Sequence, residues 1–155
     1  MLDLLVRRQA SLATAESVTG GRLAAGISAV PGASRAYVGG VVAYATEVKR
    51  ELLGVPESLV EQHGVVSAPC ARAMAAGVQS LLGSTYALAT TGVAGPDRQE
   101  DQPVGTIFVG IAGPEGVSVV SLELHGDRGA IQDRACEEAL AALGGILRRE
   151  EPGLR

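Results

Sequence analysis

The sequence predicts a layered α/β fold built on a mixed β-sheet. In the first half of the chain, short apolar runs alternate with helical patterns, as in a parallel sheet with crossover helices. In the second half, three strand-like runs follow one another without a helix, which predicts antiparallel neighbours. The chain is 46% hydrophobic but only 3% aromatic, so Ala, Val, Leu and Ile must form the core. With 155 residues, 1–155 is expected to be one domain.

The first strand is predicted between two helices. Residues 2–8 have the pattern of the end of an amphipathic helix that begins abruptly. Residues 11–15 form a short apolar run typical of a buried strand, and a helix is expected over 19–30. Pro31 and Gly32 end that helix. Ser17 therefore lies at a strand-to-helix junction.

A second strand and three helices are expected next. Residues 39–44 are rich in valine and end in a tyrosine, which favours a strand. Residues 46–54 have an N-cap threonine, an acid in the first turn and a terminal glycine. A second helix is predicted from Pro56 to Gly64. A longer one is predicted over 67–82, with a proline in its first turn.

The last part of the chain contains three strands and the closing helix. Strands are predicted over 86–91, 104–111 and 117–124, and the helix over 127–149. The connection 92–103 is longer than a hairpin needs, and such loops are either functional lids or disordered. Its first half is small and apolar, as expected of a pocket wall, and its second half is charged.

Composition restricts the possible partners. The net charge of −4 and the pI near 5.2 argue against a nucleic-acid partner, because that surface needs clustered basic residues. Cys70 and Cys136 lack a CxxC spacing, and His63 and His125 lack metal-ligand spacing, so neither a disulfide nor a metal or other cofactor is expected. No apolar run approaches ~20 residues, so we expect a cytoplasmic protein without a membrane contact.

The octet Thr14–Gly21 is the stretch most suggestive of a ligand site. It places a hydroxyl, a carboxylate and two glycines at the junction after the first strand. Ligands of open α/β sheets bind beyond the carboxyl ends of the strands, where helix N-termini attract anions. The alternative is that Ser17 or Thr19 serves only as an N-cap.

Acyl transfer is the chemistry that this octet could support. Ser17 needs a base, and Lys49 can serve if burial and a helix N-terminus keep its amine neutral. Tyr44, at the tip of the second strand, points toward the same rim. Backbone N–H groups near 19–21 or 92–95 are candidates to stabilise the oxyanion. The alternative is that Lys49 is a solvated cation and Tyr44 an ordinary strand aromatic.

The start of the closing helix offers one further candidate. Asp127 is a plausible N-cap. Arg128 is suited to clamp a phosphate or carboxylate, although an arginine at a helix start is commonly a surface residue.

Together these motifs resemble the C-terminal amidohydrolase domain of the competence/damage-inducible protein family CinA, which also occurs alone as nicotinamide-nucleotide amidase. The resemblance covers nearly the whole chain in order. The matching stretches are TAESVTGG at 14–21, VPGAS at 30–34, GGVVAYATEVKRELLG at 39–54, HGVVS at 63–67, TGVAGPD at 91–97, PVGT at 103–106 and GDR at 126–128.

The resemblance implies hydrolysis of the carboxamide of nicotinamide mononucleotide to nicotinate mononucleotide and ammonia. It implies a serine nucleophile with tyrosine and lysine partners, which correspond to Ser17, Tyr44 and Lys49, and no metal. It also implies a three-layer α/β/α sandwich on a five-stranded, mostly parallel mixed sheet, usually in a homo-oligomer. The residues then expected to bind substrate are Glu16, Thr19, Gly20, Gly21, Thr91, Gly92, Ala94, Gly95 and Arg128.

Three departures from the family pattern concern substrate preference and lid geometry. Val18 replaces the usual cysteine, Thr46 the usual asparagine, and Arg98 a common glycine. The N-terminal domain of full-length family members is not in this sequence, so its nucleotide-hydrolysing activity is not expected here. Two other functions stay open: a nucleotide-binding module that acts through competence or repair partners, and an amidase or esterase for another small substrate.

Overall fold

Five strands form a single mixed sheet in the order β2-β1-β3-β4-β5. The computed structural model describes residues 1–151, so the last four residues of the predicted 1–155 domain lie outside this range. The strands are β1 (Leu12–Glu16), β2 (Tyr37–Val42), β3 (Tyr86–Gly92), β4 (Thr106–Gly113) and β5 (Gly116–Glu123). The helices are α1 (Leu2–Arg7), α2 (Arg22–Ser28), α3 (Thr46–Glu51), α4 (Glu57–His63), α5 (Ala68–Leu82) and α6 (Arg128–Arg149), with a 3₁₀ turn at Ala33–Arg35.

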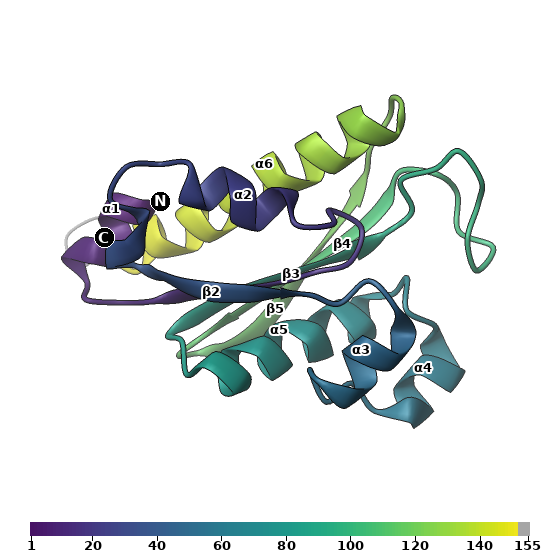
Figure 1. The fold of residues 1–155 in the computed structure, drawn as a ribbon, viewed down its shortest axis with the longest axis horizontal. Helices are drawn as coiled ribbons and strands as arrows, with labels where there is room; N and C mark the ends of the chain where they lie inside the picture. Colours follow the sequence, from purple (N-terminus) through teal and green to yellow (C-terminus); the bar gives the residue numbers. More distant parts are fainter. Residues whose placement is uncertain (152–155) are drawn as a thin grey trace.

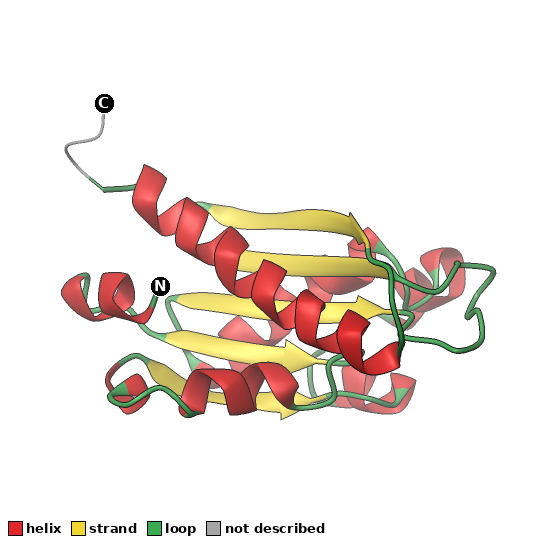
Figure 2. Cartoon of the chain, turned by 90° about the horizontal axis from the view of Figure 1, so that it is seen from above, coloured by secondary structure: helices red, strands yellow, loops and turns green. Residues whose placement is uncertain are grey.

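Helices cover both faces of the sheet, which gives the predicted three-layer sandwich. Figure 1 shows α1, α2 and α6 on one face and α3, α4 and α5 on the other. Figure 2 shows α6 crossing over the strands. Each face has its own apolar core: Leu143 of α6 packs with Ile107 on one side, and Met74 of α5 packs with Ala89 on the other.

Strand direction agrees with the expected mixed sheet. β1 pairs in parallel with both β2 and β3. β4 runs antiparallel to β3 and to β5, as predicted for consecutive strands without a crossover helix, so β4 alone is reversed. β1 is followed by β2 on one side, and the chain then crosses to β3 on the other side of β1, which makes the carboxyl end of β1 a switch point where ligands bind in α/β folds.

Glycines allow α5 to lie close to the sheet and to the turn after α3. A Cβ on Gly110 of β4 would lie 2.2 Å from the carbonyl oxygen of Ala71, and one on Gly77 would lie 1.9 Å from that of Leu53. Both distances are far below contact distance, so neither position has room for a side chain. This close packing fixes α5 beneath the strands that carry the site.

Two of the predicted element bounds that differ from the structure bear on the site. The second strand occupies Tyr37–Val42 and not 39–44, because its pairing with β1 runs from Leu12 to Glu16. Tyr44 therefore lies in the connection beyond the strand. The helix predicted over 19–30 begins only at Arg22, because Gly20 and Gly21 have φ values of 57° and 103° and form a turn.

Candidate functional site

A cavity of about 160 Å³ opens at the carboxyl edge of the sheet. It lies where β1, β2 and β3 end side by side, since Glu16 is level with Val42 on one side and with Thr90 on the other. Of the residues predicted for the site, the cavity is lined by Ser17, Tyr44, Lys49, Thr91, Gly92, Ala94, Gly95 and Arg128.

Ser17 is held at the end of β1 by its backbone. Its N–H donates to the carbonyl oxygen of Thr90 (2.9 Å), and its carbonyl accepts from the N–H of Gly20 (3.1 Å). The side chain is half-buried. Within residues 1–151, the Ser17 hydroxyl makes no hydrogen bond, so it is available to a group in the cavity.

Lys49 is buried in the wall of this cavity. Only 1% of the residue is exposed, which excludes the solvated cation considered from the sequence. Its amine donates to the carbonyl oxygens of Ala43 (2.8 Å) and Tyr44 (3.0 Å), in the connection from β2 to α3. Burial lowers the pKa of Lys49, although Cys70, Glu100 and Glu47 partly oppose this by favouring the ammonium form.

A neutral amine suits this arrangement. It has two N–H donors, which match the two carbonyl oxygens, and one lone pair for a proton. Because Lys49 also lines the cavity, that lone pair is available to a bound nucleophile or substrate. The amine thus has the properties of a general base.

The phenol of Tyr44 lies at the rim of the cavity, where it contacts Arg128. Tyr44 is 60% exposed, and its phenol oxygen accepts a hydrogen bond from Arg128 Nη2 (3.1 Å). Arg128 Nη1 donates to the carbonyl oxygen of Gly95 (2.5 Å). Arg128 therefore connects the start of α6 with Tyr44 and with the loop after β3.

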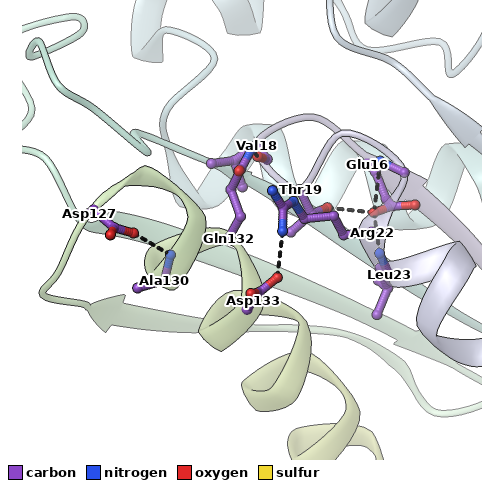
Figure 3. A network of polar contacts seen from close by, with 10 residues as sticks. Glu16, Val18, Thr19, Arg22, Leu23, Asp127, Ala130, Gln132 and Asp133 are labelled. Carbon is purple, nitrogen blue, oxygen red and sulfur yellow. Dashed lines mark hydrogen bonds and ion pairs between the residues drawn. The ribbon is translucent and has the colours of Figure 1, made fainter.

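Four predicted site residues do not line the cavity: Glu16, Thr19, Gly20 and Gly21. The Glu16 carboxylate is buried and accepts from the Thr19 hydroxyl (2.6 Å) and from the N–H groups of Gly21 (3.2 Å), Leu23 (2.7 Å) and Ala24 (3.1 Å). Figure 3 shows this carboxylate at the first turn of α2. The protein's own carboxylate occupies that helix N-terminus, so the N–H groups of Gly21, Leu23 and Ala24 are already used and are not available to a bound anion or oxyanion.

Three residues that line the cavity have backbone N–H groups without a hydrogen-bond acceptor in the described residues. They are Val18, Ala94 and Gly95. The side-chain amide of Gln132 in α6 donates to the carbonyl oxygen of Val18 (3.0 Å) and so holds the turn that contains Val18. These groups are candidates for stabilising a developing oxyanion, and two of them lie within the predicted range 92–95.

Seven cavity residues were not predicted to bind substrate: Val18, Thr46, Val65, Val66, Val93, Asp97 and Gln99. Val65 and Val66 belong to the HGVVS stretch, and that match was the available signal for them. The Thr91 hydroxyl donates to the carbonyl oxygen of Val65 (2.7 Å), which attaches the wall formed by Val65 to the end of β3.

The described residues offer neither a metal site nor a membrane-spanning helix. Residues 1–151 contain no cluster of three or more His, Cys, Asp or Glu side chains arranged to hold a metal ion, and Cys70 and Cys136 are free. None of the described helices has the length and apolar character needed to cross a bilayer.

The fold and the cavity define a three-layer α/β/α protein with a polar pocket at the carboxyl ends of parallel strands, lined by a hydroxyl, a buried amine and a guanidinium. The CinA C-terminal domain model matches residues 1–147. The chain belongs to the CinA family.

Relatives and solved structures agree with this assignment. A CinA-like protein of Frankia casuarinae is 56% identical over 95% of this chain, and a putative competence-damage inducible protein of Symbiobacterium thermophilum is 47% identical over 90%. The chain spans about a third of these relatives, 34% and 35% of their lengths. The crystal structure of a CinA superfamily protein from Klebsiella pneumoniae superimposes with a TM-score of 0.92 at 35% identity, covering 95% of this chain and 92% of that one.

Proposed function

We propose that this chain is a nicotinamide-nucleotide amidohydrolase that converts nicotinamide mononucleotide to nicotinate mononucleotide and ammonia. Ser17 is the nucleophile, Lys49 the general base, and Tyr44 a partner at the rim. In this proposal the 1–155 segment is a single amidohydrolase domain. Resemblance to the amidase branch of the family suggests the substrate, and the chemistry of the cavity supports the reaction class.

The observation that carries the proposal is the burial of Lys49 in the wall of the cavity that Ser17 also lines. A 1% exposed amine with a lowered pKa lines the same cavity as a hydroxyl that has no partner within residues 1–151. A serine hydroxyl becomes an effective nucleophile only when a neighbouring base takes its proton. No other lysine in the chain competes for this role, since Lys49 is the only one.

Acylation begins when Ser17 Oγ attacks the carboxamide carbon. Lys49 accepts the hydroxyl proton, directly or through Tyr44, and the carbonyl oxygen becomes an oxyanion facing the free N–H groups of Val18, Ala94 and Gly95. The tetrahedral intermediate collapses as Lys49 returns the proton to the leaving nitrogen. Ammonia departs, and the nicotinoyl group remains on Ser17 as an ester.

Deacylation repeats these steps with water. Water attacks the ester carbon and gives one proton to Lys49, and the new tetrahedral intermediate breaks its bond to Ser17 Oγ. The proton on Lys49 returns to Ser17, which leaves nicotinate mononucleotide and the starting enzyme. Lys49 thus acts as base and then acid in each half of the cycle.

Recognition of the nucleotide is assigned to the remaining polar wall. Arg128 has the planar donors that bind a phosphate bidentately, and it lies at the cavity rim. Thr91, Gly92, Ala94 and Gly95 form the side of the cavity nearest to β3 and bring backbone groups close to the substrate.

The experiment is ammonia release from nicotinamide mononucleotide by the purified chain, with simple amides and esters as comparison substrates. Turnover of the nucleotide in preference to the others supports the proposal. Preference for another amide or ester would show that nicotinamide mononucleotide is not the substrate.

The names of the relatives favour a second candidate, a binding module connected with competence or damage. Calorimetry that showed nucleotide binding without any turnover would favour this module over the amidase.

A further inference from the structure

The charged half of the loop after β3 is folded into a tight turn. Gln102 N–H donates to the carbonyl of Gln99 (2.8 Å), and the reverse contact measures 3.4 Å. Glu100 and Asp101, between them, have φ values of 51° and 60°, as in the turns that join two-residue hairpins. This turn brings the Glu100 side chain against a segment 34 and 35 residues earlier in the chain.

The Glu100 carboxylate binds two consecutive backbone amides. Oε1 accepts from the N–H of Val65 (3.0 Å), and Oε2 accepts from the N–H of Val66 (2.9 Å). Gly64 allows this approach, because a Cβ there would lie 2.3 Å from Oε2, and its φ of 74° suits glycine. Hydrogen bonds from N–H groups to an ionised carboxylate are stronger than those between neutral groups.

Both ends of this contact belong to the cavity. Val65 and Val66 form part of its wall, and Asp97 and Gln99 line it from the loop that carries Glu100. The carboxylate therefore joins two sides of the cavity that come from distant parts of the sequence. Pairs of hydrogen bonds of this kind restrict how far the two sides can separate.

We propose that Glu100 is a positioning residue whose carboxylate fastens the 95–103 loop to the Val65–Val66 wall and so holds the cavity in the shape that receives the substrate. This inference rests on the proposed amidase function for its catalytic consequence, whereas the fastening itself does not depend on it. The loop corresponds to the lid considered from the sequence.

Glu100 also influences the base through its charge. The groups that affect the Lys49 amine are Glu100, Glu47 and Cys70, together with the two carbonyls that it contacts. The negative charge of Glu100 favours the ammonium form and so raises the pKa of Lys49 against the larger effect of burial. Loss of that charge should shift the acid limb of the pH–rate profile to lower pH.

The fastening is tested without any substrate, by hydrogen exchange at the Val65 and Val66 amides and by the rate of tryptic cleavage after Arg98. In Glu100→Ala both amides should exchange about tenfold faster or more, and cleavage should accelerate. Glu100→Gln retains one acceptor oxygen and should keep one of the two amides protected. Asp101→Asn is the matched control. It removes the same charge from the same turn, and within residues 1–151 the Asp101 carboxylate makes no hydrogen bond or ion pair that could be lost. Unchanged protection of both amides in Glu100→Ala would overturn the proposal.

Activity measurements then separate this inference from the proposed function. If the chain hydrolyses nicotinamide mononucleotide, Glu100→Ala should raise KM, and both Glu100 variants should shift the acid limb downward, whereas Asp101→Asn should do neither. Accelerated exchange with an unchanged KM and pH profile would refute the catalytic consequence. If the wild-type chain hydrolyses no nucleotide, the proposed function fails, and the exchange experiment still decides whether Glu100 fastens the loop.

Discussion

The backbone carbonyl of Tyr44 lies 3.0 Å from the amine of Lys49, whereas the phenol of the same tyrosine binds Arg128. The two ends of Tyr44 thus serve different parts of the cavity. The carbonyl orients the base, and the phenol lies at the rim with the guanidinium. This arrangement favours direct proton transfer between Ser17 and Lys49, with Tyr44 and Arg128 positioned around the substrate.

The pH dependence of hydrolysis should report the neutral Lys49. Because burial lowers the pKa of Lys49, the base becomes available at a lower pH than in an exposed lysine. We expect kcat/KM to rise with pH through this lowered pKa, with the midpoint of the rise below about 10.4, the ordinary lysine value. A pH profile of kcat/KM measures this, with Tyr44→Phe as the control that keeps the same acid limb. An acid limb at the ordinary lysine value would contradict the assignment.

Arg128→Ala should weaken binding of the phosphate. Loss of a guanidinium–phosphate pair is expected to raise KM for nicotinamide mononucleotide about tenfold or more and to change KM for nicotinamide riboside much less. Steady-state kinetics with both substrates measure the difference. Arg134→Ala is the control on the same helix, since Arg134 is exposed and pairs with Glu137 and Glu138. Equal effects of Arg128→Ala on both substrates would contradict the proposed contact between Arg128 and the phosphate.

Glu16→Gln should destabilise the fold. The buried carboxylate accepts four hydrogen bonds at the start of α2, and an amide replaces one acceptor oxygen by a donor that faces N–H groups. We expect a loss of about 2–3 kcal/mol in the free energy of unfolding, measured in urea. Glu115→Gln, in the exposed turn between β4 and β5, should stay within about 0.5 kcal/mol. Equal stability of the two variants would contradict the role given to Glu16.

Two helical glycines provide a matched test of the packing. Gly77→Ala should cost about 2 kcal/mol or more, because the added Cβ meets the Leu53 carbonyl at 1.9 Å. Gly26→Ala in α2 should stabilise the protein by about 0.5–1 kcal/mol, since nothing lies within 4 Å of that Cβ and alanine favours the helix. Thermal or urea unfolding of both variants measures this. Similar effects at the two positions would show that α5 does not pack as closely as described.

The order and type of the regular elements could be predicted from the sequence because local patterns determine them. The alternation of strand and helix, the consecutive strands at 86–124 and the capped helix after Asp127 are all local signals. The predicted three-layer sandwich with a mixed sheet is confirmed. The extent of the second strand was not predictable, because its pairing with β1 sets its ends. Tyr44 was therefore expected at a strand tip and lies beyond it.

The predicted site residues also fall into two groups, those that line the cavity and those that do not. Ser17, Lys49 and Thr91 line one cavity, as expected of residues that follow parallel strands. Glu16 was predicted to bind substrate, because a carboxylate beside two glycines suits either a ligand site or an internal cap. Only the direction of the N–H groups of Gly21, Leu23 and Ala24 decides between them, and these groups donate to Glu16. The contact of Glu100 with Val65 and Val66 has no local signal at all.

The most direct test of the central claim is a double-mutant cycle on ammonia release from nicotinamide mononucleotide with Ser17→Ala, Lys49→Met and the double variant. Methionine fits the buried slot of Lys49 without a basic amine. If Ser17 and Lys49 act as a nucleophile and its base, each single variant should lose about 10³-fold or more in kcat, and the double variant should lose no more than the worse single one. Losses that multiply in the double variant, or a Lys49→Met enzyme with wild-type turnover, would contradict the account.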